Sequence, residues 1–272
     1  MDPIKLSAGA LGVAILAGGS YGIYDAVSWI MPDDYLVLSK CSNKGDYSSD
    51  NKAGKDYGRY LIGAYDKQNE KWWNWSYRWW QYDLKNNSNT LDDKFNSSDK
   101  IKSAFSVKED NSADNAKALN KVCEGLYKGN SSDVDPTSGI NNLKNNFWKY
   151  CSFLGKSPTT VGVKDEKEVY QSGKHGETKK ANLISTVDPE NSVFWEVRNE
   201  EFFGNDAEIN GSSADATNDS VFHKLFKTPV GENRGHIRDA CKKAYGLSSS
   251  ESGSDKATEA NVLKFCSLKG KE

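Results

Sequence analysis

The stretch KWWNWSYRWW, residues 71–80, places five tryptophans within ten positions, whereas the whole chain of 272 residues has eight. Trp72, Trp75 and Trp79 would share one side of a helix, because side chains three and four positions apart lie above one another. The alternation from Trp73 to Trp79 also suits a half-buried strand. This stretch alone therefore leaves helix and strand open, and it leaves a buried core and an exposed binding platform open as well.

The pattern around this stretch occurs twice in the chain. LIGAYD at 61–66 matches LISTVD at 183–188, and Trp75-x-x-Arg78 matches Trp195-x-x-Arg198. Three further matches follow in the same order: Phe105 with Phe226, each in a short apolar helix, CEGLY at 123–127 with CKKAY at 241–245, and WKYCSFLG at 148–155 with LKFCSLKG at 263–270. Several matches in one order indicate an internal duplication.

The second copy favours a helix for the tryptophan-rich stretch. Its equivalent, SVFWEVRNEEFF, breaks the alternation because Asn199, Glu200 and Glu201 are consecutive. A further helix is expected after an N-cap at Ser112, ending at Gly129. We therefore expect a mainly α fold, with an N-terminal transmembrane helix followed by two duplicated small helical units that are rich in loops.

The duplication and the local composition predict the boundaries. They are a signal anchor or transmembrane segment at 1–31, a stalk at 32–58, helical repeat unit 1 at 59–157, a linker at 158–180 and helical repeat unit 2 at 181–272. Short strands are possible within the polar connectors, at YLVL in the stalk and at TTVGV in the linker.

The N-terminal segment predicts a membrane helix. Residues 6–24 contain nineteen uncharged residues between Lys5 and Asp25, which as a helix span about 28 Å, roughly one hydrocarbon core. The charges on either side favour a single-pass protein of the cell membrane with the bulk of the chain extracellular. The alternative is a signal peptide cleaved before Ser20. Small residues recur every four positions on one side and would let two such helices pair: Ala10, Ala14, Gly18 and Gly22.

Four of the five cysteines stand at matched places in the two copies. We predict disulfides between Cys123 and Cys151 and between Cys241 and Cys266, each joining the last two helices of its unit. Such bridges contribute on the order of 3–4 kcal/mol each in the chain-entropy model. The alternative is four buried thiols in a reducing compartment. Cys41 remains unpaired and could link two chains beside the membrane.

The sequence offers no chemistry for a reaction. A net charge of −2 lacks the basic excess typical of nucleic-acid binders. We find no phosphate loop, GxSxG or HExxH motif, and the three histidines form no zinc ligand set with the cysteines. We therefore assign no catalytic residue, cofactor or metal, and expect no enzymatic activity. An unrecognised hydrolase is the least favoured alternative.

The second copy also bears on whether the tryptophans are core or surface. It has one Trp and several Phe at the equivalent place, and Phe replaces Trp more easily in a core than in a fixed binding site. We therefore expect Trp75 and Trp195 in the core, with Arg78 and Arg198 at its edge. Other rings should stay partly exposed as a contact surface, Trp72 and Trp80 first among them.

Three features together resemble one known group: the N-terminal MDPIKL with ALGVA, the W-x-x-R element, and the K-[Y/F]-C-S motif near each unit's end. The chain resembles the large paralogous families of hypothetical proteins of haemotropic mycoplasmas, wall-less bacteria that live on red blood cells. The resemblance implies a surface-exposed antigen or adhesin-like protein that contacts a host-cell protein or glycan, and it implies no catalytic residue. A variable structural or decoy coat protein is the alternative.

Overall fold

The computed structural model describes residues 30–137, 141–163, 169–216, 220–231, 234–251 and 255–271. The chain divides into two compact units, unit 1 (Met1–Lys156) and unit 2 (Ser157–Glu272). The membrane helix expected at 6–24 lies outside the described residues. Within the described ranges, none of the helices has the length and apolar character needed to span a bilayer.

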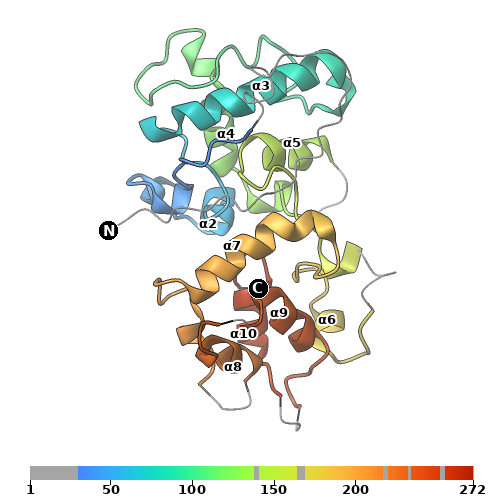
Figure 1. Cartoon of the computed structure of the whole chain (residues 1–272). Helices are drawn as coiled ribbons and strands as arrows, with labels where there is room; N and C mark the ends of the chain where they lie inside the picture. The colour runs from blue at the N-terminus through green and yellow to red at the C-terminus, as the bar shows by residue number, and fades with distance from the viewer. Residues whose placement is uncertain are drawn as a thin grey trace. The chain divides into compact units, whose positions relative to one another are not determined.

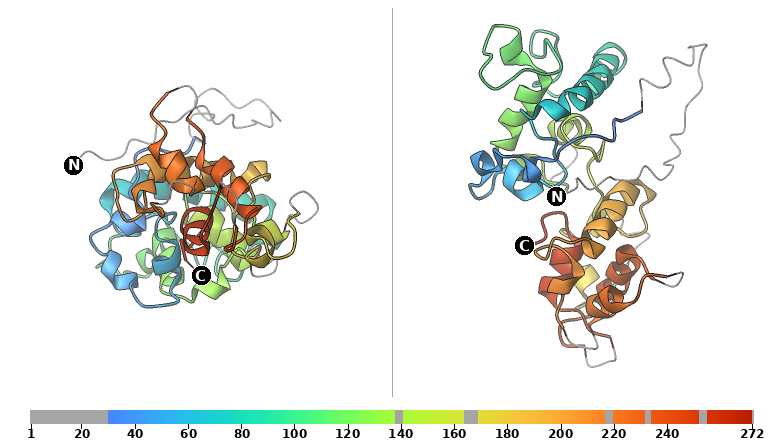
Figure 2. Two further views of the ribbon diagram at one scale, coloured as in Figure 1. Left: turned by 90° about the horizontal axis from the view of Figure 1, so that it is seen from below. Right: turned by 60° about the vertical axis from the view of Figure 1, so that its left-hand side comes forward.

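Helices dominate both units, as the sequence predicts (Figure 1). Unit 1 contains α2 (Ala53–Tyr57), α3 (Glu70–Asn86), α4 (Leu119–Tyr127) and α5 (Asn142–Tyr150). Unit 2 contains α6 (His175–Thr178), α7 (Ser192–Phe203), α8 (Val221–Lys227), α9 (Ile237–Tyr245) and α10 (Glu259–Cys266). In unit 1, α3 contacts α4 and α5, and in unit 2, α9 contacts each of the other helices. Figure 2 shows the same elements from two further directions.

Short turns and single backbone bridges make up the connections. The 3-10 turns are Leu38–Lys40, Lys44–Tyr47, Lys67–Asn69, Ser88–Thr90, Asn115–Lys117, Ser131–Asp133, Val161–Val163, Pro189–Asn191 and Gly211–Ser213. The strands expected at YLVL and TTVGV are one antiparallel bridge each, Val37 with Ile62 and Thr160 with Ile184. The described residues contain isolated bridges but no longer strand.

The expected stalk and linker belong to the units themselves. Leu38, Tyr47 and Tyr57 are between 0% and 2% exposed, so residues 32–58 pack into unit 1. Val161 and His175 are buried in the same way in unit 2. The predicted starts of the units at 59 and 181 were therefore too late. Segments built from 3-10 turns lack the helical periodicity that marks a core-forming stretch in sequence.

Each unit is built around a Leu-Ile pair whose backbone is bonded on two sides. In unit 1, the Leu38 amide donates to the Leu61 carbonyl at 2.8 Å, and the Ile62 amide donates to the Cys151 carbonyl at 3.1 Å. The Leu-Ile pair thus joins the N-terminal segment of the unit to the end of its last helix. We call this arrangement the central crossing.

Unit 2 repeats the central crossing with its own residues. The Val161 amide donates to the Leu183 carbonyl at 2.9 Å, and the Ile184 amide donates to the Cys266 carbonyl at 3.0 Å. All four Leu and Ile residues of the two crossings are 0% exposed. The duplication indicated by the sequence is therefore present in the hydrogen bonding of the two units.

A tyrosine and a disulfide close each crossing. The Tyr127 hydroxyl lies 2.9 Å from the Ile62 carbonyl oxygen and 3.0 Å from that of Cys151. The Tyr245 hydroxyl does the same in unit 2, at 2.9 Å from Ile184 and 3.3 Å from Cys266. The predicted disulfides are confirmed, with Cα–Cα distances of 5.6 Å for Cys123–Cys151 and 5.7 Å for Cys241–Cys266.

A buried asparagine before each long helix completes the crossing. The Asn69 side-chain amide donates to the carbonyls of Leu36 and Gly63, both at 2.8 Å, and its oxygen accepts from the Leu36 amide at 2.6 Å. Asn191 makes the corresponding three bonds in unit 2, to Thr159 and Ser185. An amide that satisfies three backbone groups at once fixes where the N-terminal segment meets the helix.

The hydrogen bonds also correct the alignment of the tryptophans. The Trp73 indole donates to the Gly63 carbonyl at 3.2 Å, and the Trp195 indole donates to the Ser185 carbonyl at 3.0 Å. Trp195 is therefore equivalent to Trp73, and the W-x-x-R match with Trp75 was wrong by two positions. Aligning the two copies without gaps from LIGAYD and LISTVD also pairs Trp73 with Trp195. The same alignment pairs Ser76 with Arg198.

Two smaller expectations were also wrong. Helix α4 begins after Ala118, well beyond the expected cap at Ser112. The Leu119 amide donates to the Ser103 carbonyl at 2.9 Å, which holds the residues before α4 beside residues 101–106. Phe226 lies in α8 as expected, but Phe105 lies in an irregular segment.

The corrected register predicts unequal costs for two tryptophans. Trp73→Ala removes an indole that is 0% exposed, so it should lower the free energy of unfolding by about 3–5 kcal/mol. Trp75→Ala, at a half-buried position, should cost clearly less. Urea unfolding of the full-length protein checks both variants, and equal losses would contradict the register.

Candidate contact surface on helix α3

The aromatic side chains of helix α3 fall into a fully buried set and a set that is half-buried or exposed. Trp72, Trp73 and Trp80 are at most 1% exposed, and the Trp80 indole donates to the Phe95 carbonyl at 2.7 Å. The prediction of Trp72 and Trp80 as contact residues was therefore wrong. Trp72 also meets Trp73 edge-on, with ring centres 5.0 Å apart. Trp75, expected in the core, is half-buried instead.

Whereas Tyr77 stacks on Trp80 with ring centres 5.1 Å apart, the other three remaining rings, Trp75, Trp79 and Tyr82, form a stripe along the outer side of α3. Their spacing of four and three residues places them in one line. The ring centres of Trp75 and Trp79 lie 6.5 Å apart, and those of Trp79 and Tyr82 lie 6.1 Å apart. Neighbouring rings meet at 75° and 77°, so they do not form one flat stacking platform. Tyr82 is 47% exposed.

A line of cations runs beside this aromatic stripe. Lys71, Arg78 and Lys85 are all exposed and stand seven residues apart, a spacing that returns to nearly the same side of a helix. The acidic residues of α3 are Glu70, its first residue, and Asp83, which is buried. The stripe and the cation line together are called the α3 face. From Lys71 onward this face carries positive charge and no exposed carboxylate.

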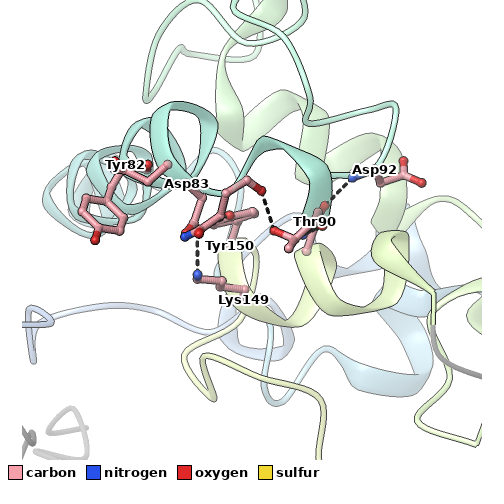
Figure 3. Close-up of polar contacts among 9 residues, drawn as sticks. Tyr82, Asp83, Thr90, Asp92, Lys149 and Tyr150 are labelled. Carbon is pink, nitrogen blue, oxygen red and sulfur yellow. Dashed lines mark hydrogen bonds and ion pairs between the residues drawn. The ribbon is translucent and has the colours of Figure 1, made fainter.

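Asp83 fastens the end of α3 to α5 (Figure 3). Its Oδ2 accepts from Lys149 Nζ and from the Tyr150 hydroxyl, both at 2.5 Å, and its Oδ1 accepts from Asn87 at 3.0 Å. Burial alone would raise the pKa of Asp83, but these hydrogen bonds outweigh it and leave the pKa below its usual value. The carboxylate thus holds Lys149, whose Nζ lies 5.9 Å from the centre of the Trp79 ring.

The second unit shows which features of α3 the fold requires. In the corrected register the buried positions keep their rings in α7: Trp72 with Phe194, Trp73 with Trp195, and Trp80 with Phe202. The stripe does not persist, since Val197, Glu201 and Gly204 replace Trp75, Trp79 and Tyr82. The same helix therefore forms around the same crossing without an aromatic stripe on its outer side.

The charge of the face is also reversed in unit 2. The corresponding side of α7 carries Val193, Glu196, Val197, Glu200 and Glu201, which we call the α7 face. Glu201 accepts from Arg198 at 3.0 Å. Partial desolvation of its carboxyl raises the pKa of Glu200, although the residue is exposed, and the neighbouring charges of Glu196 and Glu201 raise it further. Three carboxylates within six positions therefore repel one another on this face.

Arg198 lies deeper than expected. We expected Arg78 and Arg198 at the edge of the core, but the Arg198 side chain is 1% exposed and its Nη2 donates to the Ser267 carbonyl at 2.8 Å. Its equivalent, Ser76, donates to the Tyr150 carbonyl at 2.8 Å. Arg78 belongs to the exposed α3 face. One buried position thus accepts either Ser or Arg, because each bonds a carbonyl near the end of the last helix.

Cys41 is not placed to join two chains. Its residue is 3% exposed, and its thiol donates to the Val37 carbonyl at 3.4 Å. Burial raises the pKa of the thiol to about 12, which suppresses the thiolate that disulfide exchange requires. The folded unit therefore does not present Cys41 to another copy. Among the described residues, no group of three His, Cys, Asp or Glu side chains is placed to hold a metal ion.

Comparison with protein-family models, with curated proteins and with solved structures gave no match. The proposal of a contact surface on α3 therefore rests on the residues of this chain alone. Sequence analysis missed the α3 face because it matched Trp75 with Trp195. The signal that could have found it is the gapless alignment, in which the half-buried Trp75 and Trp79 and the exposed Tyr82 have no aromatic counterpart.

The repulsion on the α7 face predicts a pH-dependent stability. Because the folded-state pKa of Glu200 is raised, its ionisation destabilises unit 2, and this cost disappears as the pH falls through that pKa. Glu200→Gln should therefore raise the melting temperature at about pH 7 and leave it unchanged at about pH 3. Thermal unfolding at both pH values checks this, with the exposed Glu208→Gln as the control. A lower melting temperature for Glu200→Gln at neutral pH would contradict it.

Proposed function

We propose that this is a membrane-anchored surface protein that acts through contacts with its surroundings, as an antigen or adhesin-like host-contact protein, and not as an enzyme. In this proposal residues 6–24 anchor a single-pass chain whose bulk is extracellular. The disulfide in each unit supports export, because such bridges persist in oxidising compartments. The resemblance to surface-protein families of haemotropic mycoplasmas supports the same role.

The observation that carries the contact role is the aromatic stripe of the α3 face. Trp75 and Trp79 are half-buried and Tyr82 is exposed, and aromatic residues that keep part of their ring at the surface are enriched in protein interfaces. Unit 2 builds the equivalent helix with Val197 and Glu201 in place of Trp75 and Trp79, so the stripe is not needed for folding. The adjacent cation line favours a partner with negative charge, such as an acidic patch of a host protein or an anionic glycan.

A structural coat protein is the second candidate function. It is favoured by one observation, the acidic α7 face, which has the opposite charge to the α3 face and occupies the equivalent position in the duplicated fold. A protein that carries two complementary faces is suited to assemble with copies of itself.

Host-cell binding tests the contact role. The full-length protein is displayed in vesicles, and its binding to red blood cells is compared with that of the variant Trp75→Val, Trp79→Glu, Tyr82→Ala. Two of these changes introduce the residues that α7 already carries, so the variant should fold. We expect binding to fall about tenfold or more, because this is the usual effect of removing aromatic residues that dominate an interface.

The matched control is Val169→Ala with Val230→Ala, which changes two residues that are 80% and 86% exposed outside the face. It should bind like the unchanged protein. Equal binding by the stripe variant, at an unchanged melting temperature, would refute the contact role of the α3 face.

A further inference from the structure

We propose that the α3 face of one copy binds the α7 face of a second copy. This inference rests on the proposed function in one respect, namely that the α3 face is a contact surface, and it names the partner of that surface. The two faces occupy equivalent sides of equivalent helices in the duplicated fold. In such a contact, α3 of one copy would meet α7 of the other, and these two helices are equivalent elements of the duplicated fold.

Charge is the first argument for this pairing. The α3 face carries Lys71, Arg78 and Lys85, and the α7 face carries Glu196 and Glu200, all of them exposed. Glu201 lies beside them and is held by Arg198. The chain as a whole is nearly neutral, at −2, so the separation of charge between the two faces is a local feature. Oppositely charged faces attract one another and exclude like pairings, α3 with α3 or α7 with α7.

The apolar residues of the two faces also suit each other. Val193 and Val197 form a half-buried apolar strip in the middle of the α7 face, flanked by the glutamates. On α3 the residue that matches Val197 is Trp75, the first ring of the aromatic stripe, and the residue that matches Val193 is the cation Lys71. Docking the two helices side by side would pack large rings on small aliphatic side chains, which is how aromatic anchors contribute most at interfaces.

The isolated α7 face has an unfavourable feature that such a partner removes. Glu196 and Glu200 are four residues apart on one helix, where like charges destabilise it, and Glu201 adds a third carboxylate. The pKa of Glu200 is raised by partial desolvation of its carboxyl and by these two neighbours. Cations from the α3 face of another copy would offset this repulsion.

The contact is heterologous, because it joins two different faces. Every copy carries both faces, so each contact leaves one α3 face and one α7 face for further copies. Such contacts extend into rows, or close into a ring if the geometry permits. Copies anchored in one membrane would meet at high effective concentration, so a weak contact would suffice.

A charge-swap experiment tests the pairing on the full-length chain in detergent. The first variant carries Lys71→Glu, Arg78→Glu and Lys85→Glu, which makes both of its faces acidic. The second carries Glu196→Lys and Glu200→Lys, which makes both faces basic and leaves Glu201 with Arg198. Sedimentation velocity over a range of concentrations measures association, and melting temperatures confirm that both variants are folded.

We expect the unchanged protein to associate as its concentration rises, and less so at high salt. Each variant alone should lose this association, with an association constant at least about tenfold lower. An equimolar mixture should recover it, because the acidic variant and the basic variant then offer complementary faces to each other. Recovery in the mixture also shows that both variants kept their fold.

Three results would overturn the inference. If each variant still associates on its own, the association arises from another part of the chain, for example from the N-terminal small-residue stripe. A mixture of folded variants that stays monomeric would mean that the α3 face has another partner. An unchanged protein that stays monomeric at every concentration would exclude a contact between copies. If the first variant still loses host-cell binding in these last two cases, the proposed function stands and only the inference fails.

Discussion

The double hydrogen bonding of one Leu-Ile pair organises each unit. Leu61 and Ile62 accept and donate bonds on opposite sides, so the N-terminal segment, the pair and the end of the last helix are held together within one layer of backbone. Backbone groups buried this deeply must be paired, and the asparagine, the tyrosine and the disulfide supply the remaining partners and the covalent closure. Each long helix is then bonded to the residue after the pair through one buried indole, Trp73 to Gly63 and Trp195 to Ser185.

The backbone groups of the crossing find their hydrogen-bond partners inside the unit. The residues on the outer side of the long helix can therefore change without breaking those bonds. The two copies demonstrate this inside one chain. They keep rings at the buried positions of α3 and α7, but on the outer side one copy carries an aromatic stripe with cations and the other carries valines with glutamates. The tyrosine–carbonyl bonds of the crossing remain within 2.9 to 3.3 Å in both units. The crossing therefore supplies interactions that both units need to fold, whereas the outer side of the long helix, for which we propose a contact role, differs between them.

The sequence predicted what depends on local periodicity and matched spacing. The helical class follows from local periodicity, whereas the two disulfides and the burial of Trp195 follow from comparing the two copies of the duplicated pattern. It could not predict the role of Asn69, because that amide bonds Leu36, 33 positions earlier in the chain. It placed Trp72 and Trp80 on the surface because five tryptophans cover more than half of a helix, and periodicity alone does not show which arc faces inward. The false W-x-x-R match arose because a Ser and an Arg serve the same buried position in the two units, bonding carbonyls near Cys151 and Cys266.

Native-state hydrogen exchange of the full-length protein tests the dependence on the crossing most directly. The amides of Leu38, Ile62, Val161 and Ile184 donate across the two crossings at 2.8 to 3.1 Å. If the crossing organises each unit, these amides exchange only through global unfolding of their unit, as slowly as the most protected amides of α4 and α9. If they exchange as fast as the surface loops while the helices remain protected, the crossing opens independently of the helices, and the account of the fold is wrong.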